Sequence, residues 1–239
     1  MLQLFENVTS VLLGTTATVA VAHTLLGIDH SLPFIALGRA RQWSLQRTVT
    51  VTAACGIGHV ASSVAIGGIG AVAGATIDSL AWVESARGQV AATLLIGFGL
   101  TYASWAGWKI RRGATHSHLH VHADGILHDH PHSHEGEHLH PHGAAGSLTP
   151  WALFVIFLLG PCEPLIPLMV VPAMSGSWVV LAAVVGVFGV LTVLTMSVTV
   201  AVGYRVCGAV PRSGLARMAD LAAGLAVAAS GAAVLFLGL

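Results

Sequence analysis

The stretch Leu25-Leu-Gly-Ile-Asp-His-Ser-Leu32 decides the fold, because Leu158-Leu-Gly-Pro-Cys-Glu-Pro-Leu165 matches it without a gap. The same register pairs three further positions: Gly56 with Gly189, His59 with Thr192 and Ser62 with Thr195. Polar and helix-breaking positions coincide in the two stretches, so the match goes beyond a shared richness in leucine. The two halves of the chain therefore resemble two copies of one unit.

Around these stretches lie six apolar runs that can cross a membrane as helices, which takes about 20 residues each. Charged residues make up only 8% of the chain and the mean hydropathy is +0.81, which excludes an ordinary soluble domain. The runs are rich in small residues that let membrane helices approach closely, and they are too continuous for barrel strands. The expected spans are 8–27, 48–74, 88–110, 150–172, 178–204 and 219–239.

The repeat and the span count together predict an inverted topology. Three spans per copy is an odd number, so the second copy crosses the membrane in the opposite direction. We therefore expect an all-α integral membrane protein with a 3+3 inverted-topology repeat and broken helices in spans one and four. Its parts are a first repeat (1–110), a His-rich loop (111–149) and a second repeat (150–239). In transporters built this way, the substrate site lies where broken helices meet near the midplane.

Basic residues predict the orientation, because they gather in cytoplasmic loops. Nine of the ten fall in the loops after spans one, three and five: Arg39, Arg41, Arg47, Lys109, Arg111, Arg112, Arg205, Arg212 and Arg217. Arg87 falls in the opposite loop together with Asp78 and Glu84. We expect a plasma (inner) membrane protein with both termini outside and the His-rich loop in the cytoplasm.

That loop carries eleven histidines: His116, His118, His120, His122, His128, His130, His132, His134, His138, His140 and His142. Histidine alternating with proline and glycine does not build a packed core, so we expect disorder. Neutral imidazole suits Zn, Cu, Ni and Co, and many weak sites in tandem capture ions by effective concentration. A solvated spacer or a pH-dependent charged tether is the alternative.

Few ionisable groups lie within the spans, and they gather at the repeat motifs. They are His23, Asp29 and His30 at the end of span one, His59 in span two, and Cys162 and Glu163 in span four. Imidazole, carboxylate and thiolate suit Ni, Co or Zn better than Mg or Ca. We expect Cys162 and Glu163 to face Asp29 and His30, with His59 completing the shell.

Each of these residues also has a structural interpretation. On a straight helix His23 and His30 share a face but lie about 10 Å apart along the axis, so one ion reaches both only if the turn between them is unwound. Asp29 and His30 are also compatible with an interfacial ion pair, His59 with a bond to a neighbouring helix, and Cys162 with inert packing. Glu163 between two prolines points to a cation or a proton.

The motif from His23 to Asp29-His30 resembles the His-x4-Asp-His signature of nickel/cobalt transporters, with one additional residue in the spacing. Gly58-His59 with Ser62-Ser63 is similar to the Gly-His-Ser motif of their next span. A cytoplasmic His-rich loop is similar to that of nickel/cobalt efflux proteins. The resemblance implies a place in the broad group that includes lysine exporters and sulfite-exporter-like proteins.

Gly160-Pro-Cys-Glu-Pro-Leu165 also resembles the Pro-Cys-x-x-Pro motif of membrane thiol–disulfide carriers, which form inverted repeats too. Those carriers have one cysteine in each copy, so that two thiols exchange a disulfide. Here Asp29 stands at the matching position of the first copy. The resemblance implies a scaffold that carries metal ligands where its relatives carry thiols.

The sequence therefore predicts a secondary transporter of a divalent transition metal, not an enzyme. Ni and Co come first, with Zn, Cd and Fe as further candidates. The metal is substrate, no prosthetic group is expected, and the partners are the lipid bilayer and metal ions. No nucleotide motif and no basic field for nucleic acid occurs. A cytoplasmic capture loop favours export by alternating access.

Other functions stay open at this point. They are a thiol–disulfide electron carrier using Cys162, a sulfite-type anion exporter, and a metal sensor or assembly partner of a metalloenzyme. The sequence also leaves open the identity of the metal, the direction, the coupling ion and the oligomeric state, a homo-oligomer included.

Overall fold

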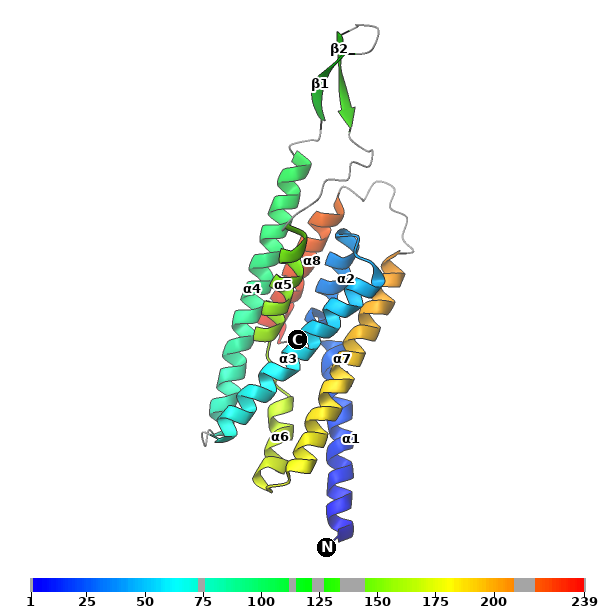
Figure 1. The fold of residues 1–239 in the computed structure, drawn as a ribbon. Helices are drawn as coiled ribbons and strands as arrows, with labels where there is room; N and C mark the ends of the chain where they lie inside the picture. Colours follow the sequence, from blue (N-terminus) through cyan, green and yellow to red (C-terminus); the bar gives the residue numbers. More distant parts are fainter. Residues whose placement is uncertain are drawn as a thin grey trace.

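A computed structural model describes residues 2–72, 76–111, 115–121, 127–133, 145–208 and 218–238. The body of the molecule is a bundle of helices, drawn upright in Figure 1. Five of the described helices are long and apolar enough to cross a membrane: α1 (Leu2–Leu26), α3 (Leu45–Val72), α4 (Ile77–Arg111), α7 (Trp178–Gly208) and α8 (Ala219–Leu237). The bundle is all-α, and the chain is a multi-pass membrane protein.

Two further apolar segments are interrupted where glycine and proline fall in the sequence. After α1 the chain makes one short 3-10 turn, η1 (Ile28–His30), and continues as α2 (Leu32–Ala40). In the second half, α5 (Ala145–Leu159) stops before α6 (Leu165–Met174). Pro161 and Pro164 lack the N–H that a continuous helix needs there. The breaks predicted for the first and fourth apolar runs are present.

The helices pack through small residues and two apolar clusters. A Cβ added to Gly99 of α4 would lie 2.4 Å from the Ala228 nitrogen of α8, so the two backbones are in direct contact. Helix α7 packs against both α1 and α3. The larger apolar cluster includes Phe34, Leu37, Leu153 and Phe157, which are buried between α2 and α5.

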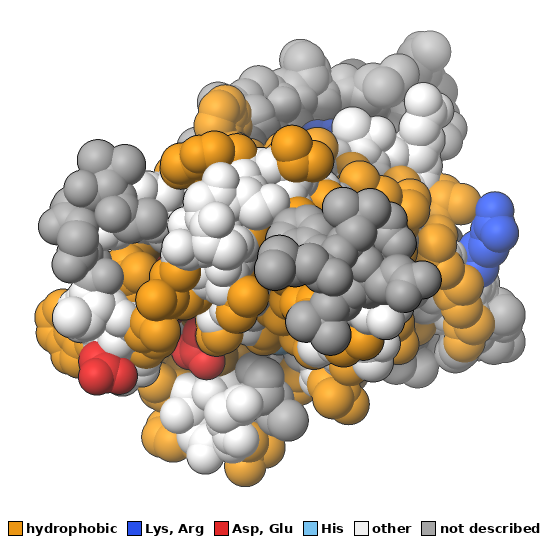
Figure 2. Space-filling model, turned by 90° about the horizontal axis from the view of Figure 1, so that it is seen from below, with side chains coloured by type: hydrophobic (Ala, Val, Ile, Leu, Met, Phe, Trp, Pro, Cys, Tyr) orange, Lys and Arg blue, Asp and Glu red, His pale blue; other side chains and the backbone are white. Residues whose placement is uncertain are grey.

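Basic and aromatic side chains meet at one end of the bundle, the upper end in Figure 1, where α2 and α4 finish. The Arg39 guanidinium lies 4.7 Å from the ring centroid of Tyr204, and that of Arg41 lies 5.1 Å from Tyr102. Such pairs are typical of a membrane–water interface. Figure 2 shows the other end, where the described side chains include many hydrophobic ones and a few acidic and basic ones. We call the two ends the basic end and the opposite end.

Helix α4 begins earlier than the sequence predicts. We expected span three to start near residue 88, with Asp78, Glu84 and Arg87 in a loop, but α4 starts at Ile77 and contains all three. Glu84 and Arg87 form an ion pair, so their charges neutralise one another and do not end the helix.

The His-rich segment also differs from expectation in its described part. Residues Thr115–Val121 (β1) and Leu127–Ser133 (β2) form an antiparallel hairpin above the bundle, where we expected disorder. The register places His116 opposite His132, His118 opposite His130 and His120 opposite His128. Histidine at every second position has the period of a strand, which favours this pairing. His122, His134, His138, His140 and His142 lie outside the described residues, as do Arg112, Arg212 and Arg217.

Candidate metal centre

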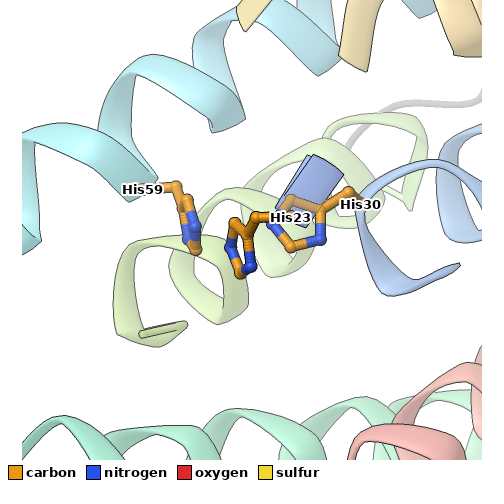
Figure 3. Close-up of side chains that lie close together, drawn as sticks. All are labelled: His23, His30 and His59. Carbon is orange, nitrogen blue, oxygen red and sulfur yellow. The ribbon is translucent and has the colours of Figure 1, made fainter. Parts of the chain in front are cut away.

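Three histidines from separate elements meet in the middle of the bundle, side by side in Figure 3. His23 is on the last turn of α1, His30 ends η1 and His59 lies in α3. One ring nitrogen from each lies within 4.8 Å of the other two. The ring centroids of His23 and His30 are 4.9 Å apart, and those of His30 and His59 are 5.1 Å apart. We call these residues the histidine cluster.

The break after α1 brings the cluster together. A continuous helix would separate His23 and His30 by about 10 Å along its axis. At the break the ring of His30 instead folds back over Gly27, where an added Cβ would lie 2.4 Å from His30 Nδ1. Only glycine leaves room for the ring at this position. The unwound turn considered from the sequence is therefore present, and it places His23 beside His30.

Hydrogen bonds orient two of the rings. Asp29 Oδ1 accepts from His30 Nδ1 at 2.9 Å, and the Phe157 carbonyl oxygen lies 3.4 Å from His59 Nδ1. Both acceptors require a proton on Nδ1, and in a neutral ring with that proton the lone pair is on Nε2. Within the described part of the chain, Nε2 of His23, His30 and His59 is buried without a hydrogen-bond partner.

This arrangement has the chemistry of an N-donor metal site. Buried polar atoms are almost always paired, so three unpaired ring nitrogens in one place call for a missing partner. Carboxylate and carbonyl groups that hold the far nitrogen of a ligating histidine are the usual support of such sites. Ring nitrogens around a tetrahedral ion with bonds of about 2.1 Å lie about 3.4 Å apart. The rings would therefore have to close inward slightly to bind one ion.

Cys162 and Glu163, which the sequence predicted to face Asp29 and His30, lie outside this cluster. The Cys162 side chain is fully buried in an apolar cluster with Leu165 and Phe188. Glu163 is exposed and lines a cavity beside α4. The three cysteines are unpaired, and Cys55 packs in the larger apolar cluster, away from Cys162.

A buried ion pair that the sequence analysis did not assign to a site lies next to the cluster. The side chains of Glu84 and Arg87 are only 1% and 13% exposed, and Arg87 Nη1 bonds Glu84 Oε1. Glu84 Oε2 accepts from the Cys162 backbone N–H at 3.0 Å and from the Ser63 hydroxyl at 3.1 Å.

Arg87 forms hydrogen bonds with the α5–α6 break. Its Nη2 donates to the carbonyl oxygens of Leu158 at 3.0 Å and Gly160 at 3.1 Å, and to the Ser62 hydroxyl at 2.8 Å. These carbonyls are ones that the end of α5 leaves without helical partners. The pair therefore holds the break against α3 and α4, one turn from His59. In the sequence, this pair is indicated only by two opposite charges that lie three residues apart.

No family model, no curated protein and no solved structure matches this chain. The fold and the residues of the site therefore carry the functional argument.

Proposed function

We propose that this protein is a secondary transporter of a divalent transition-metal ion, with Ni and Co first among the candidates. The observation that carries the proposal is the histidine cluster, in which each residue brings one ring nitrogen within 4.8 Å of the other two and has a buried Nε2 without a hydrogen-bond partner among the described residues. A multi-pass helical fold places that cluster beside a broken helix, which is where inverted-repeat transporters bind their ions. Imidazole nitrogen favours Ni, Co and Zn over Mg or Ca.

The positions of the helix ends support a 3+3 inverted repeat with six crossings. In the register that aligns Leu25 with Leu158, the end of α1 at Leu26 falls on the end of α5 at Leu159. The start of α2 at Leu32 falls on that of α6 at Leu165. The start of α3 at Leu45 likewise falls on that of α7 at Trp178. In this proposal α5 and α6 together make the crossing that neither is long enough to make alone.

The direction we propose is export from the cytoplasm across the plasma membrane. The basic end would face the cytoplasm by the positive-inside rule, which places the His-rich segment there as an ion-collecting loop. The ion would lose its water, bind the histidine cluster, and be released when the two halves rearrange. Protons compete for the same nitrogens, which gives a route to proton/metal antiport.

Flux into proteoliposomes tests the proposal. Purified protein should move Ni²⁺ or Co²⁺ into or out of vesicles that contain a metal-sensitive dye. His59→Ala should reduce flux at low metal concentration about 100-fold or more, because one of three ligands is lost. Thr192→Val is the matched control, since Thr192 is equally buried on α7 but lies outside the cluster.

Two results would contradict transport through this site. One is a metal flux in the His59→Ala variant that equals that of the parent protein. The other is tight metal binding with no flux in vesicles of either orientation, which is the behaviour of a metal sensor or assembly partner.

A further inference from the structure

A cavity of about 320 Å³ adjoins the histidine cluster. It lies between α4, the end of α8 and the α5–α6 break, and its lining includes Glu163 and Gln89 together with the ring of His23. Six waters at about 30 Å³ each occupy roughly 180 Å³, so a hydrated divalent cation fits the space. His23 belongs to both the cavity wall and the cluster.

The polar groups of this cavity suit a cation. Among the described residues that line it, Glu163 is the carboxylate and none is lysine or arginine. Arg87 is nearby on α4, but its guanidinium is engaged with Glu84 and with the carbonyls of the break. A carboxylate at a partly apolar opening concentrates cations near it.

On the side of the cluster toward the basic end, the path is closed by apolar packing. The ring centroid of Phe157 lies 6.4 Å from those of His30 and His59. It also lies 4.7 Å from the ring centroid of Phe34. Phe34 is fully buried, as are Leu37 and Leu153 beyond it. A hydrated ion has no passage through such packing.

We propose that the cavity is the vestibule through which a divalent cation passes between the histidine cluster and the opposite end of the molecule. Glu163 is the first group the cation meets, and His23 is the ligand that transfers it into the cluster. In this proposal the conformation described here gives access from the opposite end, while Phe34 and Phe157 close the side toward the basic end. This inference rests on the transport function proposed above.

Thiol labelling tests the vestibule independently of transport. In a Cys207→Ser background, which removes the exposed cysteine, Gln89→Cys places a thiol in the cavity wall. Val90→Cys is the matched control, because its side chain is half-exposed on the same helix but does not line the cavity. Cationic trimethylammonioethyl and anionic sulfonatoethyl methanethiosulfonates are compared in vesicles of both orientations.

We expect Gln89→Cys to react from the opposite end only, and Val90→Cys to stay at the background rate. The cationic reagent should react about fivefold faster or more relative to the anionic one, and Glu163→Gln should remove that preference. Labelled Gln89→Cys protein should lose most of its Ni²⁺ flux but keep equilibrium Ni²⁺ binding in detergent. Ser85→Cys lines the same cavity and replaces Gln89→Cys if that variant does not fold.

Three results would contradict the vestibule. The cavity thiol does not react from the opposite end, the preference for the cationic reagent persists in the Glu163→Gln variant, or labelling leaves the Ni²⁺ flux unchanged. Each of these results leaves the histidine cluster intact as a transport site. The proposed function itself fails if the unlabelled protein does not bind Ni²⁺ at equilibrium, or if the His59→Ala variant transports Ni²⁺ at an unchanged rate.

Discussion

Gly27 determines whether the histidine cluster can exist. The ring of His30 occupies the space where any other residue at position 27 would carry its Cβ, only 2.4 Å from Nδ1. A side chain there must push the ring away or straighten the turn, and either movement separates His30 from His23. Glycine at position 27 therefore determines where the ring of His30 lies.

Gly27→Ala should abolish metal binding at the cluster while the protein still folds. We expect at least a 100-fold rise in the Ni²⁺ dissociation constant, because His30 is displaced as a ligand. Gly14→Ala in the preceding helix α1 is the control, since a Cβ there meets nothing within 4 Å. Titration calorimetry of the two purified variants measures the difference. Equal affinities would show that the His30 ring position does not matter.

Asp29 orients His30 and does not need to touch the metal itself. Its Oδ1 accepts the Nδ1 proton of the ring. Asp29→Asn keeps an oxygen acceptor, so we expect a loss of Ni²⁺ affinity of about tenfold, and Asp29→Ala should lose more, up to about 100-fold. Exposed Asp78→Asn is the control for charge. If Asp29→Asn matches Asp29→Ala, the carboxylate acts through its charge or as a ligand.

At the scale of single residues, the sequence singles out polar side chains in apolar runs, but it does not predict how the fold groups them. Asp29, His30 and His59 stand out as polar groups in apolar runs, and they lie together in the fold. The side chains of Cys162 and Glu163 turn elsewhere, because their direction between two prolines depends on how α6 packs. His23 joins the cluster because the turn at Gly27 shortens its distance from His30, which spacing on a straight helix does not predict.

Among the elements, the α5–α6 break depends on a pair of charges from α4. Glu84 and Arg87 bond the Cys162 N–H and the carbonyls of Leu158 and Gly160, which have no other helical partners. Burying two charges costs free energy, and their bonds to one another and to the break offset that cost. The pair therefore fixes the end of α5 beside His59.

Replacing either charged residue alone should destabilise the protein strongly. We expect Glu84→Leu or Arg87→Leu to lower the free energy of unfolding by about 3–5 kcal/mol, because a buried charge is left unpaired. The double variant should lose less than the sum of the two. Denaturant titration in detergent measures all three. Thr93→Val is the control, since its hydroxyl bonds a carbonyl of its own helix. Additive losses would contradict a coupled pair.

The helix breaks and the starts of α7 and α8 were predictable, but the start of α4 was not. Glycine and proline mark the interruptions after α1 and α5 directly, because they act through the local backbone. Helix α4 starts at Ile77 and includes Glu84 and Arg87, whose ion pair and burial in the bundle the hydropathy of the sequence does not predict. The β1–β2 hairpin depends on hydrogen bonds between two neighbouring strands, which the alternation of histidine favours but which we did not predict.

In the whole molecule, the histidine cluster and the His-rich segment have separate roles in our account. The cluster lies within the bundle, whereas the hairpin stands beyond the basic end (Figure 1). A loop with many weak sites raises the local ion concentration without taking part in the crossing itself.

Replacing the eleven loop histidines with serine, at constant length, should therefore change capture but not turnover. We expect maximal Ni²⁺ flux within about twofold of the parent protein and a half-saturating concentration about tenfold higher. Vesicle flux over a range of Ni²⁺ concentrations separates the two quantities. Loss of maximal flux would place the loop in the translocation path.

The central claim is that one metal ion is bound by three histidines within a membrane fold. Anomalous diffraction from Ni²⁺-soaked crystals of the loop-serine variant tests it most directly, because the eleven competing imidazoles are gone. We predict one anomalous peak about 2.0–2.1 Å from a ring nitrogen of each of His23, His30 and His59. A peak bonded instead to Cys162 or Glu163, or no peak in the bundle at saturating Ni²⁺, would contradict the account.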